Sequence, residues 1–249
     1  MTARSAAIIL VVATASAIVT TMAVRMILGR QMSVEIDNSI YTTQGVDISA
    51  HNGVVDFDSV AQSGIRFVYM KATEGATWRD SRFASNYAEA AAAGLNVGVY
   101  HFFRFDIEGW RQSVNLLRTI GSRRLDLPIA IDVEEWGNPS GYSTEQVVDN
   151  LRSMIELVRR VGREVIIYTN KDGYHRYVRG RFDDVDLWIC SFTNPPLHEH
   201  ERWTLWQYSH IGHVDGIKGA ADLCTFNTPC KGGYESWLAT MPSVARVEW

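Results

Sequence analysis

The amino-acid sequence predicts an α/β protein: a single modified βα barrel of the TIM type, with about five βα units and three closing strands, after an N-terminal transmembrane or signal helix. Three observations predict this fold. Short β-rich runs alternate with helical patterns, as in parallel strands joined by crossover helices. Eight such runs follow the leader, which is the strand number of a TIM barrel. The connections between the last three runs are too short for crossover helices, so we expect the closing part to be irregular or partly antiparallel.

The eight predicted strands span residues 45–49, 66–73, 96–104, 128–135, 164–170, 186–192, 203–209 and 221–226. The clearest helix is predicted at 143–161, where Ser143 and Gln146 have the spacing of a capping box and Gly162 is placed to end the helix. The apolar stripe of this helix consists of Val147, Leu151, Met154, Ile155 and Val158.

Three regions are predicted along the chain of 249 residues. Residues 1–30 contain an uncharged apolar run at 5–24 that is long enough to span a bilayer, with arginine on both flanks. This pattern favours a membrane anchor, while small alanine residues within the run leave a cleaved signal peptide open. Residues 31–43 form a polar tether, and residues 44–249 form the barrel domain. We therefore expect an extracytoplasmic barrel, held at the membrane or secreted if the leader is cleaved.

Composition excludes nucleic acid as a partner and leaves one possible disulfide undecided. The formal net charge of −4 predicts no basic surface for nucleic acid. Three cysteines are too few for a disulfide framework and lack the paired spacing of a zinc site. Cys224 and Cys230 bracket a short loop, and the sequence leaves open whether they form a disulfide. Cys190 lies inside an apolar run and is predicted to be a buried free thiol.

The strand predicted at 128–135 carries the strongest candidates for catalysis. Side chains alternate along a strand, so Ala130, Asp132 and Glu134 share one face and three aliphatic side chains share the other. The aliphatic face belongs against the helices, which leaves both acids facing the barrel axis near the carboxyl end of the strand. Burial and like charge raise the pKa of one of two neighbouring carboxyl groups. We expect Glu134 to be the protonated acid and Asp132, which lies deeper, the carboxylate, although acids at this spacing also form ordinary salt bridges.

Two further acids are expected near this pair. Asp47 lies in the first predicted strand and Asp222 in the last, and these strands become neighbours when a barrel closes. A cluster of four carboxylates is also compatible with a divalent metal, with His51 and His101 as added ligands. No HExxH spacing supports that alternative.

Motifs spread along the chain resemble the glycoside hydrolase family 25 lysozymes, the muramidase family that includes the Chalaropsis-type enzymes and several phage endolysins. The resemblance covers residues 44–227. It rests on the ordered occurrence of GVDIS with HNG, FVYMKATEG, AGLNVGVYHFF, the DVE triplet at 132–134, IIYTN, LWI, and LWQYS with VDGI.

The resemblance implies hydrolysis of the β-1,4 bond between N-acetylmuramic acid and N-acetylglucosamine in peptidoglycan, with no metal and no organic cofactor. By the same resemblance Glu134 corresponds to the general acid. Asp132 corresponds to the residue that positions the substrate's own acetamido group for a substrate-assisted, retaining reaction. Inversion by an activated water remains the alternative. Asp47 and Asp222 correspond to supporting acids.

The resemblance also implies a set of substrate-binding residues in the groove: Tyr100, Tyr168 and Trp206, with Lys71 and Gln207 as candidates for polar contacts. Each of the three aromatic residues could equally fill the barrel. The partner implied is the glycan strand of peptidoglycan, bound by a monomer.

Departures from the family pattern leave all four acids in place. Asn52 stands where many relatives have glutamine, and Cys224 and Thr228 replace an asparagine and a glycine of the last strand and its loop. Two other functions therefore stay open. One is a catalytically silent barrel that binds wall glycans, and the other is a metal-dependent polysaccharide hydrolase or deacetylase, which a chelator would inhibit.

Overall fold

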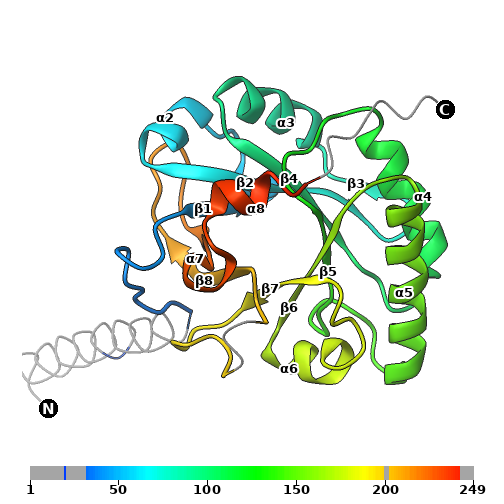
Figure 1. Ribbon diagram of the computed structural model, residues 1–249. Helices are drawn as coiled ribbons and strands as arrows, with labels where there is room; N and C mark the ends of the chain where they lie inside the picture. The colour runs from blue at the N-terminus through cyan, green and yellow to red at the C-terminus, as the bar shows by residue number, and fades with distance from the viewer. Residues whose placement is uncertain (1–19, 21–31, 199–201, 242–249) are drawn as a thin grey trace, which may run out of the picture.

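The computed structural model describes residue 20 and residues 32–198 and 202–241 (Figure 1). The predicted leader lies almost wholly outside these residues. Within the described ranges, no helix has both the length and the apolar character needed to cross a membrane.

Eight strands form a closed barrel of mixed direction, as the sequence predicts. Six neighbouring pairs are parallel, from β1 through β8, and β9 closes the ring by pairing antiparallel with both β8 and β1. A short strand, β3, adds to the edge of β2 outside the ring. The strands are β1 (Gln44–Ile48), β2 (Ile65–Glu74), β3 (Trp78–Arg79), β4 (Asn96–Phe102), β5 (Ile129–Asp132), β6 (Val165–Asn170), β7 (Asp186–Cys190), β8 (Leu205–Gly212) and β9 (Ala221–Phe226).

Helices follow the first five barrel strands in the order expected of βα units. They are η1 (Ala50–Asn52) and α2 (Phe57–Gln62) after β1, α3 (Phe83–Ala92) after β2, α4 (Gly109–Ile120) after β4, α5 (Thr144–Arg160) after β5, and α6 (Lys171–Gly173) with the π-helical turn η2 (Tyr174–Val178) after β6. After β9 come α7 (Thr228–Lys231) and α8 (Tyr234–Leu238). The described residues between β7 and β8 and between β8 and β9 contain no helix.

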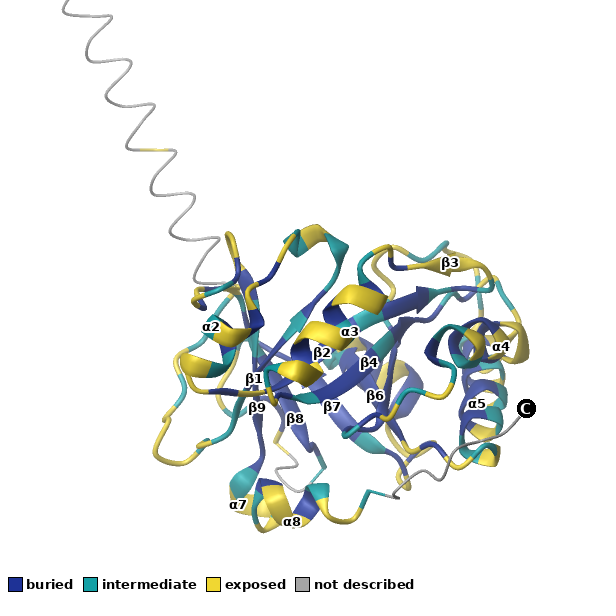
Figure 2. Ribbon diagram, turned by 90° about the horizontal axis from the view of Figure 1, so that it is seen from above, coloured by how far each residue is buried: buried dark blue, intermediate teal, exposed yellow. Residues whose placement is uncertain are grey.

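The longest of the described helices is α5, and it has the capping and end signals predicted from the sequence. The Gln146 amide donates to the Ser143 hydroxyl oxygen at 3.2 Å, and the Ser143 amide donates to the Gln146 side chain at 2.8 Å. Gly162 has a φ of +74° just after the helix, a conformation that glycine adopts without strain. The five residues of the predicted apolar stripe are all buried. Figure 2 shows the result, with helices that bury one face on the strands and expose the other.

Alternation along the strands divides the apolar core into two layers. The larger layer lies between the outer face of the barrel and its covering elements, and the smaller one fills the barrel interior. Two interior glycines make room for aromatic rings. A Cβ atom at Gly98 would lie 2.5 Å from the Tyr69 ring, and one at Gly45 would lie 2.2 Å from the Phe67 ring. α8 covers one end of the barrel, where Tyr234 stacks on Phe67 at 5.8 Å between ring centroids (Figure 1).

The side of the barrel without crossover helices is covered by the segment that precedes β1. This segment begins with an antiparallel bridge between Ser33 and Ser209 of β8. Further along it, the Tyr41 ring lies 5.9 Å from Trp203 and 5.7 Å from Trp206. Much of the segment that the sequence assigns to a polar tether is therefore packed on the barrel in place of a helix.

Candidate active site

The carboxyl ends of the parallel strands surround a cavity of about 450 Å³ that holds all four predicted acids. This is the end of a βα barrel at which enzymes of this fold place their reactive groups. Eleven of the described residues line the cavity: Met32, Asp47, Tyr100, Asp132, Glu134, Trp136, Tyr168, Trp188, Gln207, His210 and Asp222.

The alternation of β5 places Asp132 and Glu134 in this cavity. Ala130 belongs to the interior layer, whereas the three aliphatic residues of the strand pattern belong to the outer layer. The prediction of a strand to residue 135 needs correction, because β5 ends at Asp132. One more ladder bond follows, from the Val133 amide to the Tyr168 carbonyl at 2.9 Å, and then the chain turns. Glu134 thus lies just beyond the strand while its side chain still faces the cavity.

Hydrogen bonds from neighbouring loops hold Glu134 in place. The Asn138 side chain donates to the Glu134 carbonyl at 2.8 Å, and the Asn170 side chain donates to the Glu134 carboxylate at 3.3 Å. Asn170 also caps α6 by accepting a hydrogen bond from the Gly173 amide at 2.9 Å. The cap that Asn170 forms on α6 thereby fixes the orientation of one donor to the Glu134 carboxylate.

The pKa values of both Asp132 and Glu134 are raised, so both groups bind protons more tightly than ordinary carboxyl groups. Burial raises the pKa of Asp132 well above its usual value, and the Glu134 charge raises it further. Burial also raises the pKa of Glu134, while the hydrogen bond from Asn170 lowers it. The buried Oδ1 atom of Asp132 has no hydrogen-bond partner among the described residues. In the free protein these conditions favour a proton on Asp132, whereas the sequence reasoning placed it on Glu134.

Asp47 and Asp222 form a second pair, as expected for the two strands that close the barrel. They are direct neighbours in the register of β1 and β9. Oδ2 of Asp47 accepts hydrogen bonds from Gln207 Nε2 at 2.6 Å and from the Cys224 thiol at 3.5 Å. Burial and then the Asp222 charge raise the pKa of Asp47 well above its usual value. Burial raises the pKa of Asp222, while nearby His210 and the hydrogen bond with Asp47 lower it. The proton of this pair therefore belongs to Asp47.

Gln207 connects the second pair to the rest of the cavity. Its side-chain oxygen accepts a hydrogen bond from the Tyr168 hydroxyl at 2.7 Å and lies 2.8 Å from Nε2 of His210. Its amide nitrogen donates to Asp47. The structure thus brings both Gln207 and Tyr168 to the predicted site, in one hydrogen-bonded network, and Tyr100 also lines the cavity.

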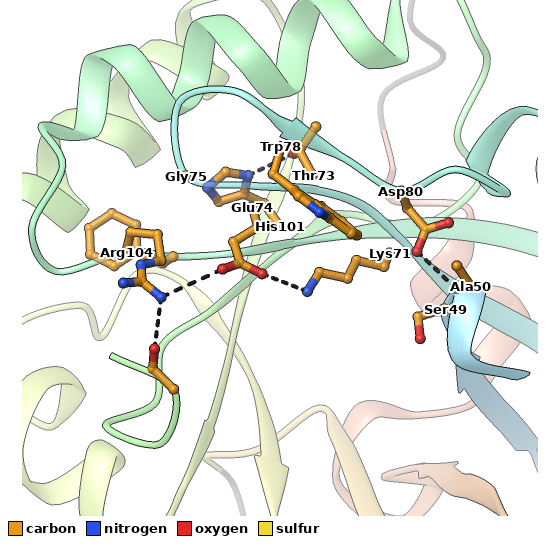
Figure 3. A network of polar contacts seen from close by, with 12 residues as sticks. Ser49, Ala50, Lys71, Thr73, Glu74, Gly75, Trp78, Asp80, His101 and Arg104 are labelled. Carbon is orange, nitrogen blue, oxygen red and sulfur yellow. Dashed lines mark hydrogen bonds and ion pairs between the residues drawn. The ribbon is translucent and has the colours of Figure 1, made fainter. Parts of the chain in front are cut away.

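Lys71 belongs to an ion-pair network beside the cavity (Figure 3). Its ammonium group lies 2.9 Å from Glu74 and 4.6 Å from the centre of the Trp78 ring. Glu74 also pairs with Arg104 at 3.5 Å, and Arg104 donates to the Gly137 carbonyl at 2.7 Å. Lys71 is not among the lining residues, but its charge lowers the pKa of Asp132. Arg104 joins the loop after β4 to the loop that carries Trp136.

Two sequence assignments are corrected by the direction of the side chains. Trp206 is fully buried in the outer layer, where its indole N–H donates to the Ser191 carbonyl at 2.7 Å, so it does not line the cavity. The cause is alternation, since Trp206 and Gln207 are adjacent and cannot share a face. His101 likewise faces outward, between Thr73 and Gln112, and burial lowers its pKa to about 4.

The proposed metal cluster does not form around these histidines. His51 lies in η1 with its residue exposed, away from the cavity-lining set. Among the described residues, no group of three or more His, Cys, Asp or Glu side chains is arranged to hold a metal ion.

The cysteines are separated. Cys190 is a buried free thiol, as predicted, and Cys224 is free and buried inside the barrel beside Asp47. Cys230 is free and exposed on α7. The disulfide that the sequence left open is therefore not formed in this structure.

Four lining residues in the described part of the chain are not predicted from the sequence. Alternation along β7 would have identified Trp188, because Leu187 and Ile189 belong to the outer layer and Trp188 to the interior. Trp136 and His210 lie beyond the predicted strand ends, where periodicity gives no direction. Met32 precedes the barrel by a dozen residues, and nothing in the local sequence indicates its position.

An acidic cavity with aromatic walls at the carboxyl end of a barrel is the arrangement of a glycoside hydrolase. The model of the glycosyl hydrolases family 25 matches residues 46–217 of this chain. The chain therefore belongs to this family.

Individual relatives agree with this assignment. The chain is 35% identical over 184 residues to the autolytic lysozyme of Clostridium acetobutylicum, a match that covers 74% of this chain and 56% of that protein. It is 32% identical over 202 residues to lysozyme M1 of Streptomyces globisporus, covering 74% of this chain and 67% of that one. The structure of a family 25 glycosyl hydrolase from Bacillus anthracis superposes with a TM-score of 0.74 and 31% identity, covering 85% of this chain and 98% of that chain.

Proposed function

We propose that this chain is an N-acetylmuramidase that hydrolyses the β-1,4 bond between N-acetylmuramic acid and N-acetylglucosamine in peptidoglycan. Family membership and the lysozyme relatives support this activity. The single observation that carries it is the buried oxygen of Asp132 without a partner, beside Glu134 in an open cavity. An acetamido N–H of a bound sugar is a donor of the right kind for that oxygen.

In this proposal Glu134 is the general acid. It gives its proton to the glycosidic oxygen as the bond to the anomeric carbon breaks, and the free hydroxyl of the leaving sugar forms. Asp132 accepts the acetamido N–H of the sugar that is cleaved, which orients the acetamido oxygen to attack the anomeric carbon. Water then opens the cyclic intermediate while Glu134 takes back a proton. Configuration at the anomeric carbon is retained.

Substrate binding accounts for the change in proton position that this reaction needs. In the free protein the pKa of Asp132 is raised most strongly by burial without hydrogen bonds. A hydrogen bond donated by the acetamido group stabilises the carboxylate form of Asp132. The charge on Asp132 then raises the pKa of Glu134, so the proton is transferred to the residue that must donate it.

The surrounding side chains suit an extended sugar polymer. Trp136 is 81% exposed at the cavity edge, and Trp188 lies deeper in the wall. Indole rings pack against the C–H faces of sugars, which supports a carbohydrate substrate. Asp47 and Asp222 shape the opposite wall and complete the acidic cavity.

The chemical identity of the new chain ends tests this function. Purified peptidoglycan is digested with the protein, reduced with borohydride and analysed by mass spectrometry. Reduced muramic acid at the new ends is expected. Reduced glucosamine would show the wrong bond specificity, and binding without cleavage would show a silent glycan-binding barrel. Loss of activity with chelator would point to a metal-dependent hydrolase or deacetylase. Proton NMR of the first product distinguishes retention from inversion.

We also propose that the N-terminal segment holds the barrel outside the cytoplasm, at the membrane. The uncharged run at 5–24 supports this, although it lies outside the described residues apart from residue 20. Packing of residues 33–41 on the barrel would leave little free tether and restrict the enzyme to nearby wall. Fractionation of cells tests the proposal, with full-length protein expected in the membrane fraction. Release of all active protein into the medium would contradict it.

A further inference from the structure

The segment before β1 reaches the rim of the cavity because it pairs with the last part of β8. The Val34 amide donates to the Tyr208 carbonyl at 3.0 Å, and the His210 amide donates to the Met32 carbonyl at 2.8 Å. These bonds join backbone atoms only. The position of Met32 is therefore set by the chain path and does not depend on its own side chain.

Packing on the outside of the barrel reinforces this path. Val34, Ile36 and Tyr41 pack against the outer apolar layer, on the side where crossover helices are absent from the described chain. The segment is thus an integral part of the barrel wall. It carries Met32 to the carboxyl ends of the strands, where the acids lie.

Met32 lines the cavity, and the residue is 40% exposed. His210, its backbone partner, and Asp222 line the same cavity. Trp136 provides another exposed apolar surface, from the loop after β5. Met32 and Trp136 together add exposed apolar surface to the cavity wall, and covering such surface with a ligand is favourable. Thioethers adapt their shape and pack well against irregular apolar surfaces.

We infer that Met32 is a substrate-contacting residue, and that the segment before β1 forms one wall of the glycan-binding groove. This inference rests on the proposed function. The Met32 side chain contacts an apolar part of one sugar of the bound strand, either the C–H face of the ring or the methyl of its N-acetyl group. The contact is the same in the ground state and the transition state because Met32 has no group that takes part in the bond-breaking step.

Steady-state kinetics of the full chain on soluble glycan strands, freed of stem peptides, tests this role. Removal of an apolar contact weakens binding of the ground state and of the transition state equally. Met32→Ala should therefore raise KM about fivefold and leave kcat within about twofold of wild type. Met32→Leu keeps an apolar side chain of similar size and should restore most of the affinity. Binding of the same strands to variants that also carry Glu134→Gln should show a matching loss in calorimetry.

Ile40→Ala is the matched control. Ile40 lies in the same segment and is 46% exposed, but it does not line the cavity. Its KM should equal that of wild type. Equal KM values for wild type and Met32→Ala would overturn the inference and leave the proposed activity intact, as would an equal rise in Ile40→Ala. Failure of the wild-type chain to cleave any strand would instead contradict the proposed function.

Discussion

On the β1–β9 side of the cavity, Asp47 is held by donors from Gln207 and Cys224, whereas on the β5 side Asp132 has a buried oxygen with no partner. Burial raises the pKa of each of these carboxyl groups. The difference lies in hydrogen bonding. A satisfied buried carboxyl group can be explained by the structure alone, whereas an unsatisfied oxygen in the cavity is available to accept a hydrogen bond from a substrate. We therefore propose a supporting role for Asp47 and Asp222, and the chemistry for Asp132 and Glu134.

The largest effect is expected at Glu134. Glu134→Gln keeps the size and the hydrogen bond from Asn170 but removes the proton donor. We expect kcat to fall about 10³-fold, the usual size of a general-acid contribution. Assays of peptidoglycan hydrolysis check this. Glu135→Gln is the control, because Glu135 pairs with Arg176 outside the cavity. Its activity should stay within about twofold of wild type, since exposed ion pairs contribute little. Equal losses in both variants would remove Glu134 from the mechanism.

A smaller loss, with a gain in stability, is expected for Asp132→Asn. The asparagine cannot hold the acetamido group as a charged acceptor, and we expect kcat to fall about 10²-fold. The raised pKa of Asp132 contributes stability that is present below the ordinary carboxyl pKa of about 4 and is lost as pH rises through the folded-state pKa. Removing the acid should therefore stabilise the protein by about 0.5–2 kcal/mol at neutral pH and much less near pH 3.

Thermal unfolding of wild type and Asp132→Asn at the two pH values measures this gain. A variant less stable than wild type at neutral pH would show that Asp132 is well satisfied in solution, against the contrast drawn between the two pairs.

A modest loss is expected on the other side of the cavity. Asp222→Asn removes the charge that accepts the proton of Asp47 but leaves the donors from Gln207 and Cys224 in place. We expect kcat/KM to fall about tenfold, less than for either acid of the β5 side. Initial rates on soluble glycan strands check that this loss is smaller than the losses in Glu134→Gln and Asp132→Asn. A loss as large as that of Glu134→Gln would make the second pair part of the chemistry.

The smallest effect is a shift in pH dependence for Asn170→Ser. Asn170 lowers the pKa of Glu134 by donating to its carboxylate, and serine still caps α6 but is too short to reach that carboxylate. The pKa of Glu134 should rise, so its proton should remain bound to higher pH. We expect the alkaline limb of kcat/KM to move to higher pH, with little change at the optimum. A move of the acid limb to higher pH, with the alkaline limb unchanged, would show instead that Glu134 acts in its ionised form.

Local sequence rules predicted much of the fold and the deepest part of the site. Strict alternation in the strand at 128–135 separated Asp132 from its aliphatic neighbours, and barrel closure brought Asp47 beside Asp222. The same alternation places Trp206 on the outer face, because its neighbour Gln207 occupies the interior face. Local rules fail beyond the strand ends and for Met32, which reaches the cavity by pairing with a strand about 175 residues later.

Titration of the carboxyl carbons of Asp132 and Glu134 by NMR, with and without a bound oligosaccharide of the wall, tests the proposed division of roles most directly. In the free protein both groups should titrate above ordinary carboxyl values, with Asp132 the higher of the two. Binding of the sugar should reverse that order and leave the proton on Glu134. Two ordinary titrations in the free protein, or an order that the sugar does not change, would contradict it.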